Sequence, residues 1–414
     1  MEYYDHFSYK IKCYGRSFKE RRSIKMNRVL YFFPHNLMDN DMGCIRRAWM
    51  LLNYFKERNF QVDLAYSDDF WEGPSTEEEL NELKKKAGVK NIFKLNKKPD
   101  KTAVFNYLKY KLLTTFAKKN KKSFPDLVTP YNRSLFNKLL MVNNYDYIII
   151  SYAYWANFIR HKKIMGRPRL LIDTHDFLTS QEQNKPELDL GVTFGDEVER
   201  LRLFDEVWAV SAEEQYVFGQ FCKNRVRLIP IAFKDNYQYE RQNVQYDLIY
   251  VASDNEHNIR SAKWFFNLVF PLIKDKVNIC VIGKITGYIP DYPNLTKVPY
   301  AENLNNYYTQ SRLAICPMLS GTGVKVKVLE ALSYGIPVIA SPRGVDGLVN
   351  KTDNGCLIAD TSKSFATCIE QLIDDSGKYA CLRKQAMAFF ENHYSEQKFY
   401  DVMDDVFNIK IPSH

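Results

Sequence analysis

Residues 320–341 read SGTGVKVKVLEALSYGIPVIAS, directly after the apolar run Leu313–Pro317. The stretch opens on two glycines, Gly321 and Gly323, and continues into a run that is compatible with a helix. A Tyr-Gly-Ile-Pro break then leads into the apolar segment Val338–Ala340. Strand, glycine-rich turn, helix and strand in this order predict a βαβ unit of a parallel sheet.

The glycine-rich turn predicts a binding site for an anion. Backbone N–H groups at such a turn can point at one anion, and the helix dipole adds partial positive charge. Lys327 and Glu330 are three residues apart and share one helical face. The ammonium can meet a diphosphate, and the carboxylate can accept hydrogen bonds from sugar hydroxyls, which favours a nucleotide-sugar over a bare nucleotide. The alternative is an ordinary glycine turn with a solvated Lys–Glu ion pair.

The same residues resemble the donor-binding segment of retaining glycosyltransferases of the GT-B fold, in family four (group 1). Members have a glycine-rich turn followed by K-x-L-E-A-[ML]-x-x-G-x-P-V-[IV]-A-[ST], which Lys327–Ser341 match. Many members also have a glutamate eight residues before the helix glutamate, where it touches the transferred sugar, but this chain has Thr322 there. The resemblance therefore implies a nucleotide-sugar donor and leaves its sugar open. The donor-binding residues that it implies are Gly43, Asn258, Gly321, Thr322, Gly323, Val324, Lys325, Lys327 and Glu330.

Strand and helix candidates alternate on both sides of a polar, turn-rich segment at 230–245. They predict an α/β protein of the GT-B class, with two doubly wound Rossmann-like domains facing a cleft, for which 414 residues give room. We expect an N-terminal acceptor-side domain at 1–235, a C-terminal nucleotide-sugar-binding domain at 246–390, and a helix within 391–414 that crosses back as in GT-B proteins. The strand candidates are Val29–Phe33, Gln61–Tyr66, Asn91–Leu95, Tyr147–Ser151, Leu170–Asp173, Glu206–Val210, Val226–Ile229, Asp247–Val251, Val277–Ile282, Leu313–Cys316, Val338–Ala340 and Cys356–Ile358.

Three positions have two interpretations each. His175 ends a strand candidate beside Asp176, which indicates a structural hydrogen-bonded pair, whereas the resemblance implies a catalytic histidine in the cleft near the transferred sugar. Gly43 starts a helix candidate, where a plain helix-start turn is equally compatible. Asn258 lies in a loop without a basic residue before Arg260, and it is either a donor contact or a helix N-cap.

The net charge of +9 is concentrated in a basic segment at 81–122. This segment contains fourteen lysines and two acidic residues, a local charge of +12, so the rest of the chain sums to −3. Within it Val104, Leu108, Leu112 and Phe116 recur at every fourth residue. A basic amphipathic helix of this kind can lie on an anionic membrane surface. An ordinary helix packed on its own domain is the alternative, and nucleic acid comes last because charge alone supports it.

Other classes are disfavoured. No apolar run approaches the roughly 20 residues that span a bilayer, and the N-terminus lacks the apolar core of a signal peptide. The eight cysteines show no C-x-x-C spacing, which disfavours a zinc site and favours a reducing cytosol. Asp39-Asn40-Asp41 has the D-x-D form of metal-dependent GT-A enzymes, but we interpret it as a polar loop and expect no metal and no cofactor. We expect a cytoplasmic protein, with the inner face of the membrane as a second location.

The resemblance implies transfer of a sugar from a nucleotide-sugar to a hydroxyl acceptor with retention at the anomeric carbon. Lys327 and the helix start would stabilise the leaving diphosphate, and His175 would orient the sugar or support the charge on its ring. The acceptor would be lipid-linked or an oligosaccharide, as in surface polysaccharide or glycoconjugate synthesis. Two alternatives stay open: a GT-B-fold nucleotide-sugar epimerase, for which the sequence offers no convincing set of acids, and a non-catalytic scaffold at a membrane surface.

Overall fold

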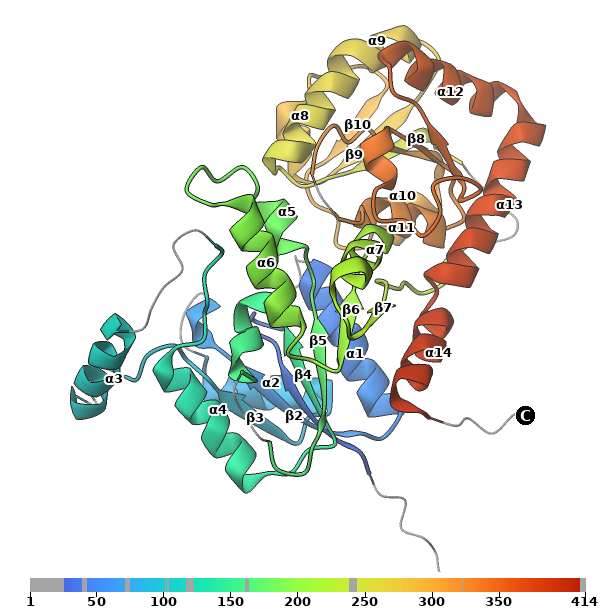
Figure 1. Cartoon of the computed structure of the whole chain (residues 1–414). Helices are drawn as coiled ribbons and strands as arrows, with labels where there is room; N and C mark the ends of the chain where they lie inside the picture. Colours follow the sequence, from blue (N-terminus) through green and yellow to red (C-terminus); the bar gives the residue numbers. More distant parts are fainter. Residues whose placement is uncertain are drawn as a thin grey trace, which may run out of the picture.

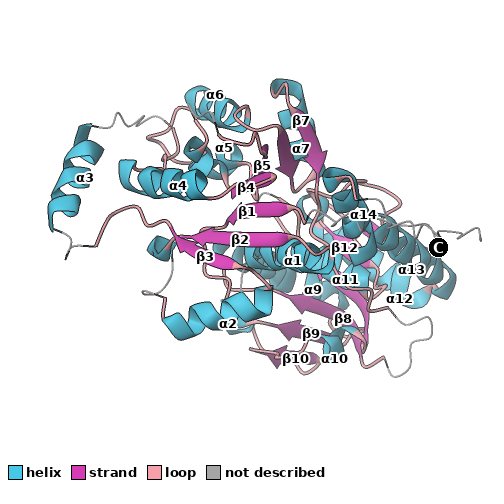
Figure 2. Cartoon of the chain, turned by 90° about the horizontal axis from the view of Figure 1, so that it is seen from below, coloured by secondary structure: helices cyan, strands magenta, loops and turns pink. Residues whose placement is uncertain are grey.

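The computed structural model describes residues 26–38, 43–70, 75–100, 102, 104–116, 123–160, 164–237, 244–321 and 323–409. These residues form two domains, each a parallel sheet with helices packed against it (Figure 1, Figure 2). The first sheet has the order β3-β2-β1-β4-β5-β6-β7 and the second has the order β10-β9-β8-β11-β12-β13. The predicted fold class of two Rossmann-like domains is therefore confirmed.

The N-terminal sheet is built from apolar runs that are buried on both faces, as expected for parallel strands. Its central strand β1 lies between β2 and β4, and its residues 29–32 are fully buried. The strands are β1 (Arg28–Phe32), β2 (Gln61–Tyr66), β3 (Asn91–Lys94), β4 (Tyr147–Ser151), β5 (Arg169–Asp173), β6 (Glu206–Ala209) and β7 (Arg225–Leu228). The helices are α1 (Gly43–Glu57), η1 (Asp68–Phe70), α2 (Glu77–Ala87), α3 (Val104–Phe116), α4 (Pro130–Val142), η2 (Ala153–Phe158), α5 (Leu178–Glu182), α6 (Leu190–Leu201) and α7 (Ala212–Phe221).

The C-terminal sheet repeats this pattern, with β8 between β9 and β11. Its strands are β8 (Tyr246–Val251), β9 (Ile279–Ile282), β10 (Leu295–Val298), β11 (Ser311–Cys316), β12 (Val338–Ala340) and β13 (Cys356–Ile358). Its helices are α8 (Glu256–Trp264), η3 (Phe265–Val269), α9 (Phe270–Ile273), η4 (Lys284–Tyr288), α10 (Asn305–Tyr308), α11 (Val326–Ser333), η5 (Pro342–Val345), α12 (Ser362–Asp374) and α13 (Ser376–His393). Every strand candidate of the sequence lies within one or two residues of an observed strand, and β10 was not predicted.

The last helix, α14 (Glu396–Phe407), lies against the N-terminal domain, and α13 leads to it from the other domain (Figure 1). Phe399, Met403 and Phe407 are buried in the N-terminal core. Asp404 accepts two hydrogen bonds of 2.8 Å from the Arg58 guanidinium. The two domains are thus joined by α14 as well as by the segment after β7.

The basic segment is not one structural unit. Its first part forms the second half of α2 and the edge strand β3, both of which belong to the N-terminal sheet layer. Helix α3 projects from the body of the domain beside α4 (Figure 1, Figure 2). No helix in the described ranges is long and apolar enough to cross a membrane.

Candidate active site

The topology brings the ends of β1, β8 and β11 to one interdomain cleft. In the first sheet the chain passes from β1 to β2 on one side and later returns to β4 on the other side of β1. In the second sheet β9 and β11 lie on the two sides of β8 in the same way. Ligands bind at such switch points in α/β sheets. The loop after β8 leads into α8, and the turn after β11 leads into α11. The two segments that the resemblance assigns to the donor are therefore neighbours in space.

The glycine-rich turn after β11 is conformationally demanding. Gly321 has φ of 99° and Gly323 has φ of 71°, which is the left-handed region that L side chains rarely adopt. The Lys325 ammonium donates a 2.7 Å hydrogen bond to the Gly323 carbonyl, so this lysine stabilises the turn from within. Burial lowers the pKa of Lys325. Thr322, the third turn residue assigned to the donor, lies outside the described residues.

Lys327 lies two residues further along the chain and is half-buried. Its Nζ atom lies 2.8 Å from Asn258 Oδ1 and 5.3 Å from the centre of the Tyr250 ring. No carboxylate of the described residues forms an ion pair with Lys327, and burial lowers its pKa. A half-buried ammonium that is held by an amide and an aromatic face, beside a helix start, is poised for an anionic ligand.

Asn258 is not a helix cap, so that alternative is wrong. Asn255 caps α8, because its side chain accepts from the backbone N–H of Asn258. The amide of Asn258 instead donates to Ser253 Oγ and accepts from Lys327. Asn258 therefore orients the ammonium group of Lys327 at the start of α11.

Glu330 connects α11 of the C-terminal domain to α1 of the N-terminal domain. One carboxylate oxygen accepts from Tyr308 Oη at 3.2 Å, and the other lies 3.7 Å from a guanidinium nitrogen of Arg46 on α1. Burial raises the pKa of the Glu330 carboxyl, while Arg46 and Tyr308 act in the opposite direction. Arg46 also stacks 4.9 Å above the ring of Phe233 in the segment between the domains. Sequence patterns did not indicate Arg46, because it is far from Glu330 along the chain.

Gly43 is the first residue of α1, at the point where this helix approaches α11. A Cβ atom at Gly43 would lie 3.7 Å from Val326 Cγ2, so the two domains are in van der Waals reach at this point. Val324 packs closely on Gly347, where a Cβ atom would lie 2.5 Å from the valine methyl. Gly43, Gly323 and Val324 all line a cavity of about 440 Å³ between the domains. The full lining is His35, Gly43, Cys44, Arg47, Tyr152, Tyr154, His175, Asp176, Gln181, Val210, Ile231, Gly323 and Val324.

His175 lies in this cavity wall and is also part of a buried polar network. Its φ of 60° is strained for a non-glycine residue, and such strain is typical of functional positions. Its Nε2 atom lies 3.1 Å from Asp173 Oδ2 and 3.1 Å from Ser151 Oγ, and its ring stacks on Tyr152 at 4.3 Å. The structural partner is thus Asp173 and not the adjacent Asp176.

Asp173 is held ionised by a second cation. Arg47 Nε lies 2.9 Å from both carboxylate oxygens, and the pair is fully buried. Burial alone would raise the pKa of Asp173, but Arg47 and His175 hold this pKa below its ordinary value. An ionised carboxylate can only accept, so Nε2 of His175 carries a proton and donates to Asp173.

Two titratable groups of the cavity were missed by the sequence analysis. Burial raises the pKa of Asp176 to about 6, and burial together with His175 lowers the pKa of His35 to about 4. Asp176 therefore changes charge nearer to neutral pH than a free aspartate does. His35 changes charge further from neutral pH than a free histidine does. Asp176 was visible only as the neighbour of His175, and nothing in the sequence singled out His35.

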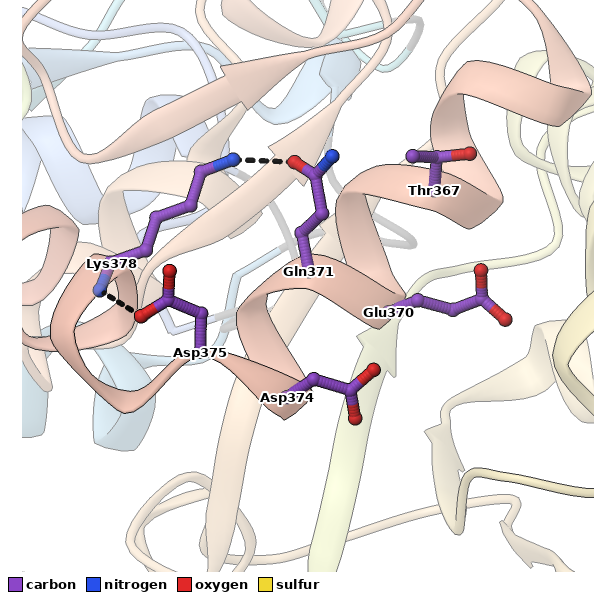
Figure 3. Close-up of a pocket in the computed structure, with 6 residues that line it drawn as sticks. All are labelled: Thr367, Glu370, Gln371, Asp374, Asp375 and Lys378. Carbon is purple, nitrogen blue, oxygen red and sulfur yellow. Dashed lines mark hydrogen bonds between the residues drawn. The ribbon is translucent and has the colours of Figure 1, made fainter.

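Metal sites and other hollows give no competing centre in the described part of the chain. No group of three or more His, Cys, Asp or Glu side chains there could hold a metal ion. The D-x-D residues 39–41 lie outside the described residues. Figure 3 shows a polar hollow on α12 and the start of α13, where Lys378 bonds to Gln371 and, through its backbone N–H, to Asp375. This hollow is on the surface of the C-terminal domain and contains none of the residues above.

The fold and the cleft define a class: the chain has the architecture of GT-B glycosyltransferases. Sucrose-phosphate synthase from Thermosynechococcus elongatus superimposes with a TM-score of 0.64 at 15% identity, over 92% of this chain and 98% of that chain. TarM gives 0.64 at 11% identity over 93% and 99%. HepE of Anabaena, in complex with UDP and glucose, gives 0.60 at 14% identity over 92% and 99%. At these identities the likeness concerns the fold.

The family follows from the sequence of the second domain. Residues 245–375, which lie in the C-terminal domain, match the family model described as glycosyl transferases group 1. The resemblance of the glycine-rich stretch to glycosyl transferases group 1 is thereby confirmed at the level of the family. The chain is also 23% identical over 159 residues to an uncharacterized 44.6 kDa protein in the cps region of Klebsiella pneumoniae. That match covers 35% of this chain and 41% of the relative, less than half of its length.

Proposed function

We propose that the protein transfers a sugar from a nucleotide-sugar to a hydroxyl acceptor with retention at the anomeric carbon. The observation that carries the proposal is the half-buried Lys327, which has no carboxylate partner among the described residues and lies beside the left-handed glycine turn at the start of α11. An ammonium and a helix N-terminus together suit a diphosphate. The match of residues 245–375 to glycosyl transferases group 1 supports the same assignment.

Glu330 gives this site a preference for a sugar-bearing nucleotide. Its carboxylate lies on the Lys327 face of α11, and its present partners are a phenol and a distant guanidinium. Both contacts are exchangeable for hydroxyls of a ribose or a sugar. HepE has been solved with UDP and with UDP-glucose, so uridine nucleotides are the first donors to test.

The chemistry assigns complementary tasks to the two domains. Departure of the nucleoside diphosphate builds negative charge, which Lys327 and the start of α11 stabilise without a metal ion. Positive charge develops on the sugar ring, and in this proposal His175, which lines the cavity, orients the ring or supports this charge. The acceptor hydroxyl attacks from the side that the diphosphate leaves, which gives retention.

The acceptor belongs on the N-terminal side of the cavity. Tyr154, Asp176 and Gln181 lie there and offer hydrogen-bonding groups to a polyhydroxylated molecule. A lipid-linked or oligosaccharide acceptor in surface polysaccharide assembly fits this side. The cps region in the name of the Klebsiella relative supports that role.

A panel of UDP-, GDP- and dTDP-sugars tests the proposal, read first by thermal shift and then by nucleotide release. We expect one nucleotide class to raise the melting temperature, and its nucleotide-sugar to release free nucleoside diphosphate slowly as the sugar passes to water. A changed sugar without release would indicate an epimerase. Absence of binding by all nucleotides would overturn the transferase and favour a scaffold.

A further inference from the structure

Helix α3 presents an apolar stripe to solvent. The side chains of Phe105, Leu108 and Leu112 are 82%, 58% and 60% exposed, and Leu113 next to them is 45% exposed. Residues 105, 108 and 112 follow the i, i+3, i+7 spacing of one helical face. The alternative in which this stripe packs on its own domain is therefore wrong for these residues. The side chains of Val104 and Phe116 lie outside the described residues.

The helix is attached to the domain by a different face. The Tyr110 ring packs edge-on against Tyr131 of α4 at 5.0 Å, and its hydroxyl donates to Ser134 Oγ at 3.1 Å. Tyr110 and Tyr107 are half-buried, whereas the leucines are exposed. Because one face already binds α4, the apolar stripe is free for a partner and is not merely an unpacked core face.

The charge around the stripe selects the kind of partner. Lys109 and Lys111 of α3 are exposed, and they belong to the segment 81–122 with its local charge of +12. A second copy of the chain would bring the same lysines to the interface and be repelled. An anionic lipid surface satisfies both properties, since apolar side chains enter the acyl boundary and lysines meet the headgroups.

We propose that α3 is a membrane-docking helix that holds the protein on an anionic lipid surface. Phe105, Leu108, Leu112 and Leu113 insert at the interface, and the flanking lysines bind headgroups. Binding is peripheral and falls as salt rises, because exposed charges are screened.

The segment after α3 links this surface to the cavity. The Phe124 ring packs edge-on against Tyr154 at 5.4 Å, and the Leu127 backbone N–H donates to the Tyr154 carbonyl at 3.1 Å. Tyr154 lines the cavity on the proposed acceptor side. If the proposed function holds, docking through α3 brings that side of the cleft to a membrane that carries the acceptor; the docking itself does not depend on that function.

Vesicle sedimentation tests the proposal with the full chain. We expect the wild type to sediment with phosphatidylglycerol-containing vesicles at low salt, and not with pure phosphatidylcholine. The variant Leu108→Ser/Leu112→Ser should bind anionic vesicles at least about tenfold more weakly, because two leucines no longer enter the interface. The variant Lys109→Gln/Lys111→Gln should weaken binding and flatten its salt dependence.

The matched control is Leu268→Ser/Leu272→Ser. This pair has the same i, i+4 spacing and similar exposure, 53% and 50%, but lies on the C-terminal domain. It should bind vesicles as the wild type does, and UDP thermal shift should be unchanged in all variants. Three results would each overturn the inference: a wild type that stays in solution with anionic vesicles, equal losses in control and α3 variants, or a wild-type dimer that the α3 variant abolishes.

Discussion

Replacement of Lys327 by methionine should weaken UDP binding by about ten- to a hundredfold while the domain keeps its fold. The ammonium is half-buried; it donates to the amide oxygen of Asn258 at 2.8 Å and lies 3.8 Å from the sulfur of Met318. A hydrogen bond to a charged group contributes about 1.5–3 kcal/mol, and about 1.4 kcal/mol changes Kd tenfold. Methionine fills nearly the same volume, so it avoids the cavity that alanine would leave.

The effect on stability should be small, because two changes oppose each other. The variant removes a partly buried charge, which stabilises the fold, and it leaves Asn258 Oδ1 without the ammonium donor, which destabilises it. Calorimetric titration with UDP and with a UDP-sugar measures the affinity, and Lys363→Met, an exposed lysine on α12, serves as the control. A Kd for UDP within twofold of the wild type would refute the phosphate assignment. A loss confined to the sugar-bearing ligand would refute it equally.

Three further predictions concern the rest of the cleft. Glu330→Gln should weaken the sugar nucleotide about tenfold or more in calorimetry, because an amide accepts hydroxyl bonds less strongly than a carboxylate; unchanged affinity removes Glu330 from the site. His175→Ala should lower turnover with little change in UDP affinity, and a fall in melting temperature with turnover per folded molecule intact would make the residue purely structural. The folded-state pKa of Asp176 is raised from 3.8 to about 6, so the stability it contributes below pH about 4 is lost as pH rises through about 6. Asp176→Asn should therefore gain melting temperature relative to the wild type between pH 4 and pH 7, and a difference that does not change with pH would contradict the assigned shift.

The strands could be predicted because each apolar run carries its own burial signal. The central strands β1 and β4 are uninterrupted apolar segments, and the sequence placed both to within one residue. Edge strand β10 reads Leu-Thr-Lys-Val, is half-exposed, and has no apolar run that could have indicated it. Apolar runs in the sequence therefore identified those strands whose two faces are both buried.

The site could be predicted only where its residues are close along the chain. The turn and the Lys327–Glu330 spacing are local, and they were visible. The contacts of Arg47 with Asp173 are not, since 126 residues separate the two. The sequence indicated an asparagine N-cap in the loop after β8. Asn255 and Asn258 are both residues of a kind that caps helices, and only the backbone geometry assigns this role to Asn255. The apolar stripe of α3 was evident from the sequence. Whether this stripe faces the domain or the solvent could not be predicted, because it depends on the contact between Tyr110 and α4.

The contact between Arg46 and Glu330 shows how the two domains can meet across the cleft without locking it. Arg46 is nearly half exposed, and its nearest nitrogen lies 3.7 Å from the carboxylate, so the ion pair contributes at most about 1 kcal/mol. Stronger contacts join the C-terminal helix α14 to the N-terminal domain, where Asp404 holds Arg58 by two short hydrogen bonds and the aromatic side chains are buried. A donor that takes over Glu330 therefore displaces a weak contact and leaves the strong one intact. If Glu330 binds the donor as proposed, the cleft would accept its ligand at little energetic cost, because the contacts of α14 do not involve Glu330.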